Sequence, residues 1–294
     1  MNIVQDRFQH DPPSPTSVGV WLKPSHYREI LETEPDIDWF EVHPENYMFE
    51  GGPSHTWLSK IRQDYPLSLQ SVGMSLGSAQ DLDTTHLNWL SRLVTRYQPF
   101  LVSDHVSWSA NGSNFLNDLL PLPYTHESLQ VMATHLEEAQ NRLGRQILVE
   151  NPSTYLQYQE EDFAEPAFLK ALCEITGCGL LLDINNVFVC AHNHGFDPWG
   201  YLTRIPHAAV KEIHLAGHSH TTVDGADIRI DDHGSPVCDQ VWALYGRYIA
   251  TYGPSPTLIE WDSNIPPLEA LLSEVATARS RIAQAPQAFA TLNT

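Results

Sequence analysis

The chain has 294 residues, of which 42% are hydrophobic and 18% charged, a balance typical of a globular protein with a large core. Its formal net charge is −20, from 36 Asp and Glu against 16 Lys and Arg, and no basic stripe offsets it, so nucleic acid is excluded as an expected partner. Because the first thirty residues contain no apolar run long enough for a signal peptide or a membrane span, we expect a cytoplasmic protein without a membrane partner.

Short β-rich apolar runs alternate with longer amphipathic segments along the chain. Eight strands are predicted at 17–21, 38–43, 67–72, 99–105, 146–150, 179–184, 210–215 and 256–261. A helix is predicted after each strand, at 24–33, 54–64, 84–96, 125–142, 163–175, 198–205, 238–252 and 267–283. Eight such pairs predict an α/β fold with a single (β/α)8 TIM-type barrel over residues 1–294, in which 1–16 and 284–294 are peripheral tails.

Two features of the connections bear on this fold. A doubly wound sheet would show a glycine-rich phosphate loop after its first strand, and the segment 21–24, Trp-Leu-Lys-Pro, is not one. Two connections, at 106–124 and 216–237, are unusually long. Long loops at the catalytic face of a barrel are usually functional.

The ends of the predicted strands are rich in metal-binding side chains. In an α/β barrel the catalytic groups come from these C-terminal ends. Six of the eight ends carry His, Asp or Glu, although 15 His and 36 Asp plus Glu are only about one residue in six. These charged groups directly follow buried runs, where desolvation is costly unless a cation or a partner compensates. The residues at the ends are Glu41, His43, Gln70, Asp104, His105, Glu150, Asp183, His214 and Glu260.

Imidazole and carboxylate donors without thiolate suit zinc, iron or manganese. Each group taken singly fits a buried ion pair equally well, whereas the whole set favours a multinuclear site. The second long loop adds Asp231 and His233, whose spacing allows both to reach one ion. Asn185, Asn186 and His194 follow Asp183 as ligands or as residues that orient ligands. The remaining helix and loop histidines, interpreted as ordinary surface or capping residues, are His126, His135, His192, His207 and His220.

These residues, in this order, resemble a known family, the multinuclear non-heme iron-dependent oxidative enzymes. This family was once catalogued as the uncharacterised families DUF692 and UPF0276, and the iron enzyme of methanobactin biosynthesis is a member. The resemblance runs from about residue 17 to about residue 275. It is carried by EVHPENY, YPLSLQSVGMSLGS, LVSDHVSW, LNDLLPLPYT, ILVENPSTYL, GLLLDINNVFVCAHNHGFDP, EIHLAGHS, IDDHG and LIEWD.

The resemblance implies a xylose-isomerase-like barrel that binds two or three iron ions, with mixed valence. It further implies oxidation of a residue, usually a cysteine, in a ribosomally made precursor peptide by O₂. A partner protein that recognises the peptide leader is expected as well. Asp183, His214 and Glu260 are expected to be catalytic, and His43 and His194 to support the ligands. The metal ligands implied are His105, Glu150, Asp183, Asn186, His214, Asp231, His233 and Glu260.

One position departs from the family pattern. Relatives usually read LHGVG at the third strand, whereas this chain has Gln70 in place of the histidine. An amide oxygen binds iron less well than an imidazole does. Two alternative functions therefore stay open: a redox-neutral zinc or manganese enzyme, resembling a phosphoesterase or a sugar isomerase, and a non-catalytic peptide-binding barrel.

Overall fold

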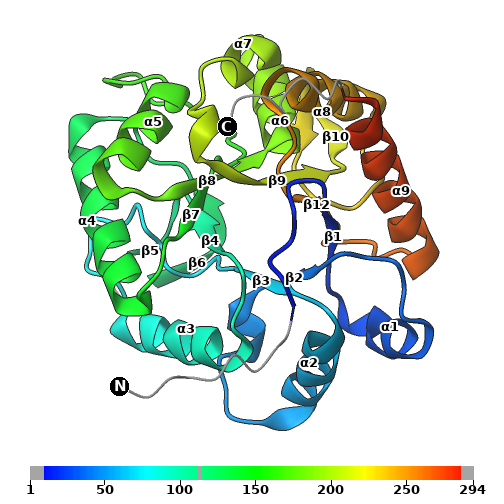
Figure 1. The fold of residues 1–294 in the computed structure, drawn as a ribbon. Coiled ribbons are helices and arrows are strands. Elements are labelled where there is room, and N and C mark those ends of the chain that lie inside the picture. The colour runs from blue at the N-terminus through cyan, green and yellow to red at the C-terminus, as the bar shows by residue number, and fades with distance from the viewer. Residues whose placement is uncertain (1–9, 112–113, 286–294) are drawn as a thin grey trace, which may run out of the picture.

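A closed barrel of eight parallel strands forms the centre of the molecule (Figure 1). The computed structural model describes residues 10–111 and 114–285. Around the barrel the strand order is β1-β12-β9-β8-β7-β4-β3-β2. The fold class predicted from the sequence is thereby confirmed. The barrel strands are β1 (Val18–Trp21), β2 (Phe40–Val42), β3 (Leu67–Gln70), β4 (Val102–His105), β7 (Leu148–Glu150), β8 (Gly179–Asp183), β9 (Val210–Ala216) and β12 (Thr257–Glu260).

Each barrel strand is short and is covered on both faces. In seven of them every residue is buried, and in β9 only Lys211 is exposed. Parallel strands with two covered faces read as continuous apolar runs, as GLLLD does in β8. The charged residues that end these runs therefore face either the barrel interior or its C-terminal mouth.

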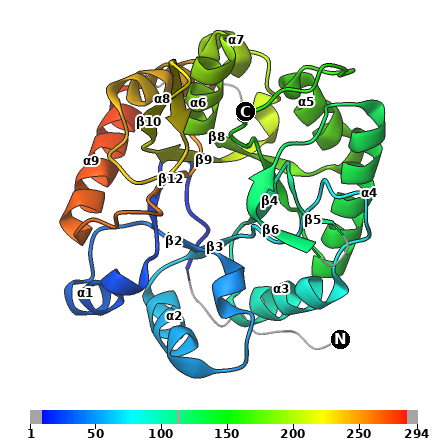
Figure 2. The same cartoon turned by 180° about the vertical axis from the view of Figure 1, so that it is seen from behind.

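A ring of helices surrounds the barrel, as the views from both ends show (Figures 1 and 2). Their starts follow ordinary capping chemistry: Thr125 and Ser128, for example, form a capping box at the start of α4. Among the described residues, no helix is long and apolar enough to cross a membrane. The helices are α1 (Tyr27–Thr33), α2 (Gly52–Asp64), α3 (Thr84–Tyr97), α4 (His126–Leu143), α5 (Glu165–Thr176), α6 (Ile184–His194), α7 (Pro198–Leu202), α8 (Asp239–Tyr252) and α9 (Leu268–Gln284).

The helix predicted after the sixth barrel strand was wrong in position. The main helix there is α6, which begins directly after β8, while the predicted segment 198–205 holds only the short α7. The carboxylate of Asp183 accepts a hydrogen bond from the Asn186 backbone N–H at 2.6 Å and so caps α6. One residue thus ends the strand and starts the helix, which leaves no connecting loop for a sequence pattern to reveal.

The two long connections each contain a β-hairpin. The first holds β5 (Trp108–Asn111) and β6 (Asn114–Leu120), and the second holds β10 (Ser219–Val223) and β11 (Ala226–Ile230). These hairpins follow β4 and β9, so both stand at the C-terminal face of the barrel. They bring segments from the two predicted loops to the mouth where the strand ends meet.

Candidate metal centre

The predicted ligands converge at the C-terminal mouth of the barrel. A cavity of about 290 Å³ opens there. Barrel strands contribute Gln70, His105, Glu150 and Glu260 to its lining, and α6 contributes Asn186. The connection after β11 adds Asp231 and His233, while β6, the segment 152–155 and Asp262 are among the other residues of the rim. Residues from distant parts of the chain therefore surround one space.

His105 and Glu150 form one corner of the cavity. His105 Nε2 lies 3.1 Å from Glu150 Oε2, and the Gln70 amide donates a hydrogen bond to the same oxygen. Burial lowers the pKa of His105, but Glu150 and Asp104 outweigh it and raise the pKa to about 9. Burial raises the pKa of Glu150 to about 7 although His105 opposes it. The charged forms of His105 and Glu150 are therefore stabilised in this buried corner by their close pairing.

The two carboxylate oxygens of Asp183, which lies buried beneath the cavity lining, have different surroundings. Oδ1 caps α6, whereas Oδ2 is buried and has no hydrogen-bond partner among the described residues. Burial and the neighbouring Glu150 raise the pKa of Asp183 well above its ordinary value. The Asn186 amide donates to Glu150 Oε1 at 3.4 Å, and its own Oδ1 is likewise without a partner among the residues described. Orphaned buried oxygens are costly unless a cation or an unseen donor satisfies them.

Glu260 joins the two remaining histidines. Its Oε2 lies 3.1 Å from His214 Nδ1, and its Oε1 lies 3.3 Å from His233 Nδ1. His233 Nε2 also approaches Asp231 Oδ1 at 2.7 Å, and Asn185 donates to that same oxygen at 2.8 Å. Burial alone would raise the pKa of Glu260, but the two histidines lower it well below its ordinary value. Glu260 is therefore an anion held between two imidazoles.

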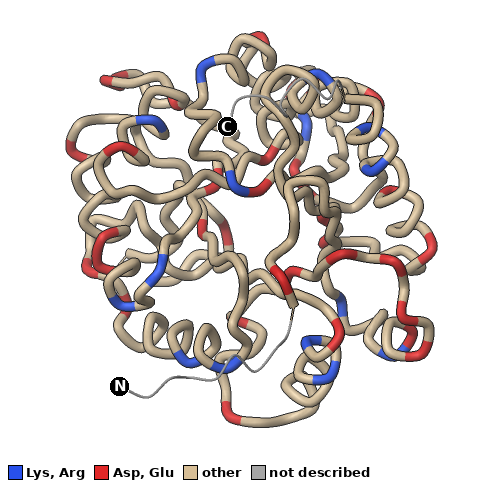
Figure 3. The backbone as a smooth tube through the Cα atoms, viewed as in Figure 1, with Lys and Arg blue, Asp and Glu red and all other residues tan. Residues whose placement is uncertain are grey.

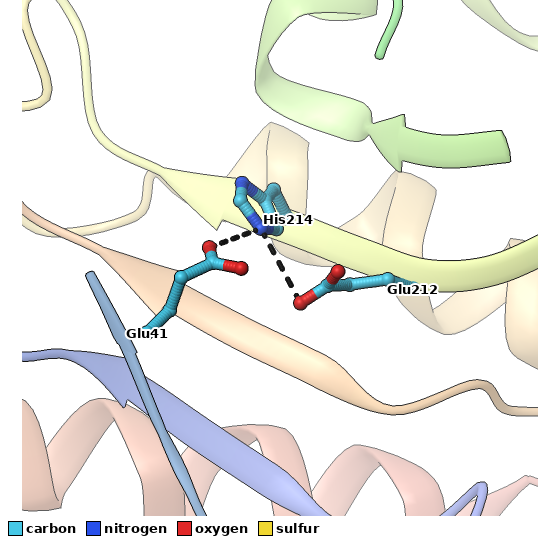
Figure 4. A group of neighbouring side chains, drawn as sticks. All are labelled: Glu41, Glu212 and His214. Carbon is cyan, nitrogen blue, oxygen red and sulfur yellow. Dashed lines mark ion pairs between the residues drawn. The ribbon is translucent and has the colours of Figure 1, made fainter. Parts of the chain in front are cut away.

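A second layer of carboxylates lies beneath His214 (Figure 4). His214 Nε2 is 3.0 Å from Glu41 Oε1 and 3.7 Å from Glu212 Oε1, and all three residues are fully buried. Sequence reasoning noted Glu41 only as a strand end and missed Glu212. The available signal was the two-residue period of β9, which places Glu212 on the same face as His214.

Carboxylates outnumber imidazoles in this region. Within residues 10–111 and 114–285, three groups of side chains have ligand atoms close enough to hold a cation. Across these groups and the pairs described above, six carboxylates meet three imidazoles. Imidazole and carboxylate donors suit iron, zinc and manganese, so divalent cations would take the place of the protons that these buried carboxyl groups otherwise hold. The three groups are Glu41, Glu212 and His214; Glu150, Asp183 and His214; and Asp183, His233 and Glu260.

Histidines outside these groups occupy varied positions. His43 lines the cavity and its Nδ1 lies 2.9 Å from the Gln70 carbonyl oxygen. His194 lies apart from the cavity, with its Nε2 2.8 Å from Thr154 Oγ1. The interpretation of His135 as a surface or capping histidine was wrong. It is buried, and its Nδ1 contacts the Leu76 carbonyl oxygen at 2.9 Å, because α4 packs over the turn after β3.

The turn after β3 is held by Glu45. Its Oε1 accepts hydrogen bonds from Ser71 Oγ at 2.6 Å and from the backbone N–H groups of Val72 and Gly73 at 3.0 Å, and His86 Nε2 approaches at 3.0 Å. Burial would raise the pKa of Glu45, but His86 and Ser71 lower it to about 2. A Cβ on Gly73 would lie 2.7 Å from His86 Nε2, so a larger residue here would have to displace the His86 ring.

Replacing Glu45 with alanine is expected to lower the free energy of unfolding by about 3 kcal/mol or more, since several buried donors lose their acceptor. The control is Glu50→Ala, which removes an ion pair with Arg92 whose side chains are 82% and 64% exposed. We expect that control to cost less than about 1 kcal/mol. Urea unfolding of both variants measures the difference, and equal losses would contradict the structural role of Glu45.

Comparison with known proteins shows that the chain matches one family. The model of the family described as "RiPP precursor modification enzyme MbnB/TglH/ChrH" matches residues 17–283. The UPF0276 protein RB0508 of Rhizobium meliloti (strain 1021) is 51% identical over 266 residues, covering 89% of this chain and 85% of the relative. The UPF0276 protein BPP1075 of Bordetella parapertussis is 44% identical over 274 residues, covering 93% and 95%.

Solved structures share the fold at low sequence identity. Endonuclease IV from Thermus thermophilus aligns with a TM-score of 0.59 at 16% identity, covering 92% of this chain and all of the other. A xylose isomerase-like TIM barrel protein from Mycobacterium smegmatis, in complex with magnesium, aligns with a TM-score of 0.56 at 11% identity, covering 90% and 97%. At such identities the likeness shows the fold alone, and the xylose-isomerase-like architecture expected from the sequence is confirmed.

Proposed function

The chain belongs to the MbnB/TglH/ChrH family of RiPP precursor modification enzymes, and from this membership we propose that it uses O₂ and multinuclear non-heme iron to oxidise a cysteine of a ribosomally made precursor peptide. The single observation that supports a metal-dependent reaction is the clustering of the strand-end donors, with His105, Glu150 and Glu260 lining one cavity and Asp183 and His214 grouped with them. Family membership supports the peptide substrate.

The residues present fit two or three iron ions. Asp183 Oδ2 and Asn186 Oδ1 are buried oxygens without partners among the described residues, which is what unfilled ligand positions leave. We propose that one ion is held at His105 and Glu150. A second is held by Glu150, Asp183, His214 and Glu260. A third is held by Asp183, His233 and Glu260, with Asp231 and Asn186 lining the cavity as further ligands. Zinc or manganese would use the same donors.

Bound iron would supply the redox chemistry, while the protein provides orientation and a sheltered space. Asp183, His214 and Glu260, the proposed catalytic residues, are fixed by the α6 cap and by the ion pairs around Glu260. Their surroundings exclude water, since His214 and Asp183 are fully buried and Glu260 is 4% exposed. A substrate atom would therefore react beside ligands that cannot reorient.

A peptide would reach the cavity across its rim. The rim combines β6, through Asp118 and Leu119, with Ser153 and Tyr155 of the β7–α5 connection. Exposed apolar side chains stand on the same two segments, including Phe115 at 61% and Tyr155 at 51% exposure. We propose that this rim receives the precursor peptide together with a leader-recognising partner protein. Nucleic acid is not expected, because the Lys and Arg segments are scattered over the described residues and form no continuous basic stripe (Figure 3).

The proposal is tested on protein purified without oxygen. We expect elemental analysis to find two or three irons per chain, and an optical change on adding air. O₂ uptake should increase with a cysteine peptide from a neighbouring reading frame, and mass spectrometry should show a change at its cysteine. Asp183→Asn should abolish these effects, whereas Glu32→Gln, on the exposed face of α1, should not.

Zinc or manganese in place of iron, with no response to O₂, would instead support the redox-neutral alternative. A folded protein that binds no metal at all would support a non-catalytic peptide-binding barrel. Either result would contradict the proposed oxidation.

Gln70→His is expected to raise the iron content of the protein. Gln70 is 1% exposed, and its Oε1 is a weaker ligand than an imidazole placed beside His105 and Glu150 would be. Iron per chain, measured after anaerobic reconstitution, checks this. Gln63→His, at an exposed position of α2, controls for an added histidine. An unchanged iron count would mean that Gln70 does not limit occupancy.

A further inference from the structure

The His214 ring faces two different environments. Its Nδ1 faces Glu260, which lines the cavity. Its Nε2 faces Glu41 and Glu212 on the other side of the ring (Figure 4). Glu41 lies on β2 and reaches across the barrel interior, since β2 and β9 are not neighbours in the sheet. Glu212 comes from β9 itself. Side chains from two separate strands therefore meet at the same ring nitrogen.

The two carboxylates flank the ring nitrogen without forming an in-line hydrogen bond. Nε2 is 3.0 Å from Glu41 Oε1 and 3.7 Å from Glu212 Oε1, yet none of these atoms has a hydrogen-bond partner among the described residues. A ring N–H directed between two acceptors produces this geometry. Glu41 is itself fixed, because Ser68 Oγ donates to its Oε2 at 2.6 Å.

A neutral imidazole binds one cation through one nitrogen and keeps its proton on the other. If Nδ1 binds a metal ion in the cavity, Nε2 carries the ring proton. This N–H then needs a hydrogen-bond acceptor on the side of the ring that faces away from the cavity. Glu41 and Glu212 are the carboxylates at that position. They are also close enough to His214 to hold a cation of their own. Such a cation would compete for the imidazole unless the ring lost both protons.

We propose that Glu41 and Glu212 are positioning residues for His214. They hold the ring with Nε2 toward the barrel floor, so that Nδ1 is the nitrogen presented to a metal ion in the cavity. This inference rests on the proposed function to the extent that the cavity binds metal. It concerns how the ligand is aligned, and it does not depend on the identity of the oxidised substrate.

Cobalt(II) is the probe for the test, because it occupies imidazole and carboxylate sites and shifts the signals of nearby protons. Titration measures the affinity and the number of Co²⁺ ions bound, and proton NMR of ¹⁵N-histidine-labelled protein follows the shifted ring N–H of His214. In Glu41→Gln and in Glu212→Gln we expect the affinity to fall by roughly 10–100-fold. The number of ions at saturation should stay the same, and the N–H signal should move or be lost by faster exchange with water.

Glu32→Gln, an exposed change of the same kind on α1, should alter none of these quantities. Should Glu41→Gln fail to fold, Ser68→Ala removes the hydroxyl that fixes Glu41 and should displace the same N–H signal. A loss of one bound ion in either glutamine variant would overturn the proposal by making these residues ligands of a deep cation. Unchanged affinity and an unchanged N–H signal would overturn it as well. A wild-type protein that binds no Co²⁺ would defeat the proposed function and this inference together.

Discussion

The metal-free protein should lose stability as the pH rises from about 5 to about 9, by several kcal/mol in total. Burial raises the pKa of Glu150 to about 7, and burial together with Glu41 raises that of Glu212 to about 8. Both acids bind a proton in the folded state that the unfolded chain has released above about pH 4.5. The free energy of unfolding therefore falls as the pH rises. Each pKa unit of difference corresponds to about 1.4 kcal/mol.

His105 acts in the same direction. Its folded-state pKa of about 9 lies above the ordinary value of 6.5. Its contribution to the free energy of unfolding is therefore complete below pH 6.5 and is lost as the pH rises through 9. Glu260 does not change the free energy of unfolding between about pH 5 and about pH 9. Its pKa is lowered, so the stability that its carboxylate contributes is already present above pH 4.5. The metal-free barrel is thus expected to be most stable under mildly acidic conditions.

Bound metal should reverse this trend. Ligands must be deprotonated to bind, so metal affinity increases with pH, and a ligand at 1,000 times its Kd stabilises by about 4 kcal/mol. Urea unfolding at pH 5.5, 7.0 and 8.5, with chelator or with added metal, measures both effects. Glu165→Gln is the matched control. Burial raises the pKa of Glu165 to about 7 outside the metal centre, so this change should reduce the slope without altering the stabilisation by metal. A metal-free protein that gained stability between pH 5.5 and 8.5 would contradict the prediction.

Glu260→Ala should remove at least one metal ion per chain while leaving the barrel folded. The carboxylate joins His214 and His233 at 3.1 and 3.3 Å, and no other residue described above contacts both histidines. Because the side chain is 4% exposed, the metal-free variant should also be less stable, by roughly 3–5 kcal/mol, the usual cost of breaking a buried ion pair. The β12 backbone pairs with β1 and β9 independently of this side chain.

Asp262→Asn provides the matched control for this change. Asp262 also contacts His233, at 3.1 Å, but it lies at the rim, is 34% exposed and pairs with Lys23. Elemental analysis and circular dichroism of the two variants should show metal loss and a retained fold for Glu260→Ala only. Unchanged metal stoichiometry in Glu260→Ala would refute its role as a ligand.

Much of the architecture was accessible from local patterns. Runs such as GLLLD and TLIE are buried on both faces, and a run of that kind predicts a parallel strand without knowledge of its neighbours. Because the C-terminal ends of barrel strands meet at one face, the charged residues that end them predicted a shared site. The structure places those residues together, and their individual roles as ligands stay predictions until metal is measured.

Composition and strand-end chemistry by themselves determined the fold class, the kind of donor atoms and the face on which they gather, since each depends on short-range periodicity. Only the closed barrel decided that Glu41 and Glu212 lie beneath His214 and that His194 lies apart from the cavity. It also decided that Asp183 both ends a strand and caps a helix. The physical reason is that such contacts depend on barrel closure and on the direction of each side chain. Local hydrophobic patterns carry no information about either.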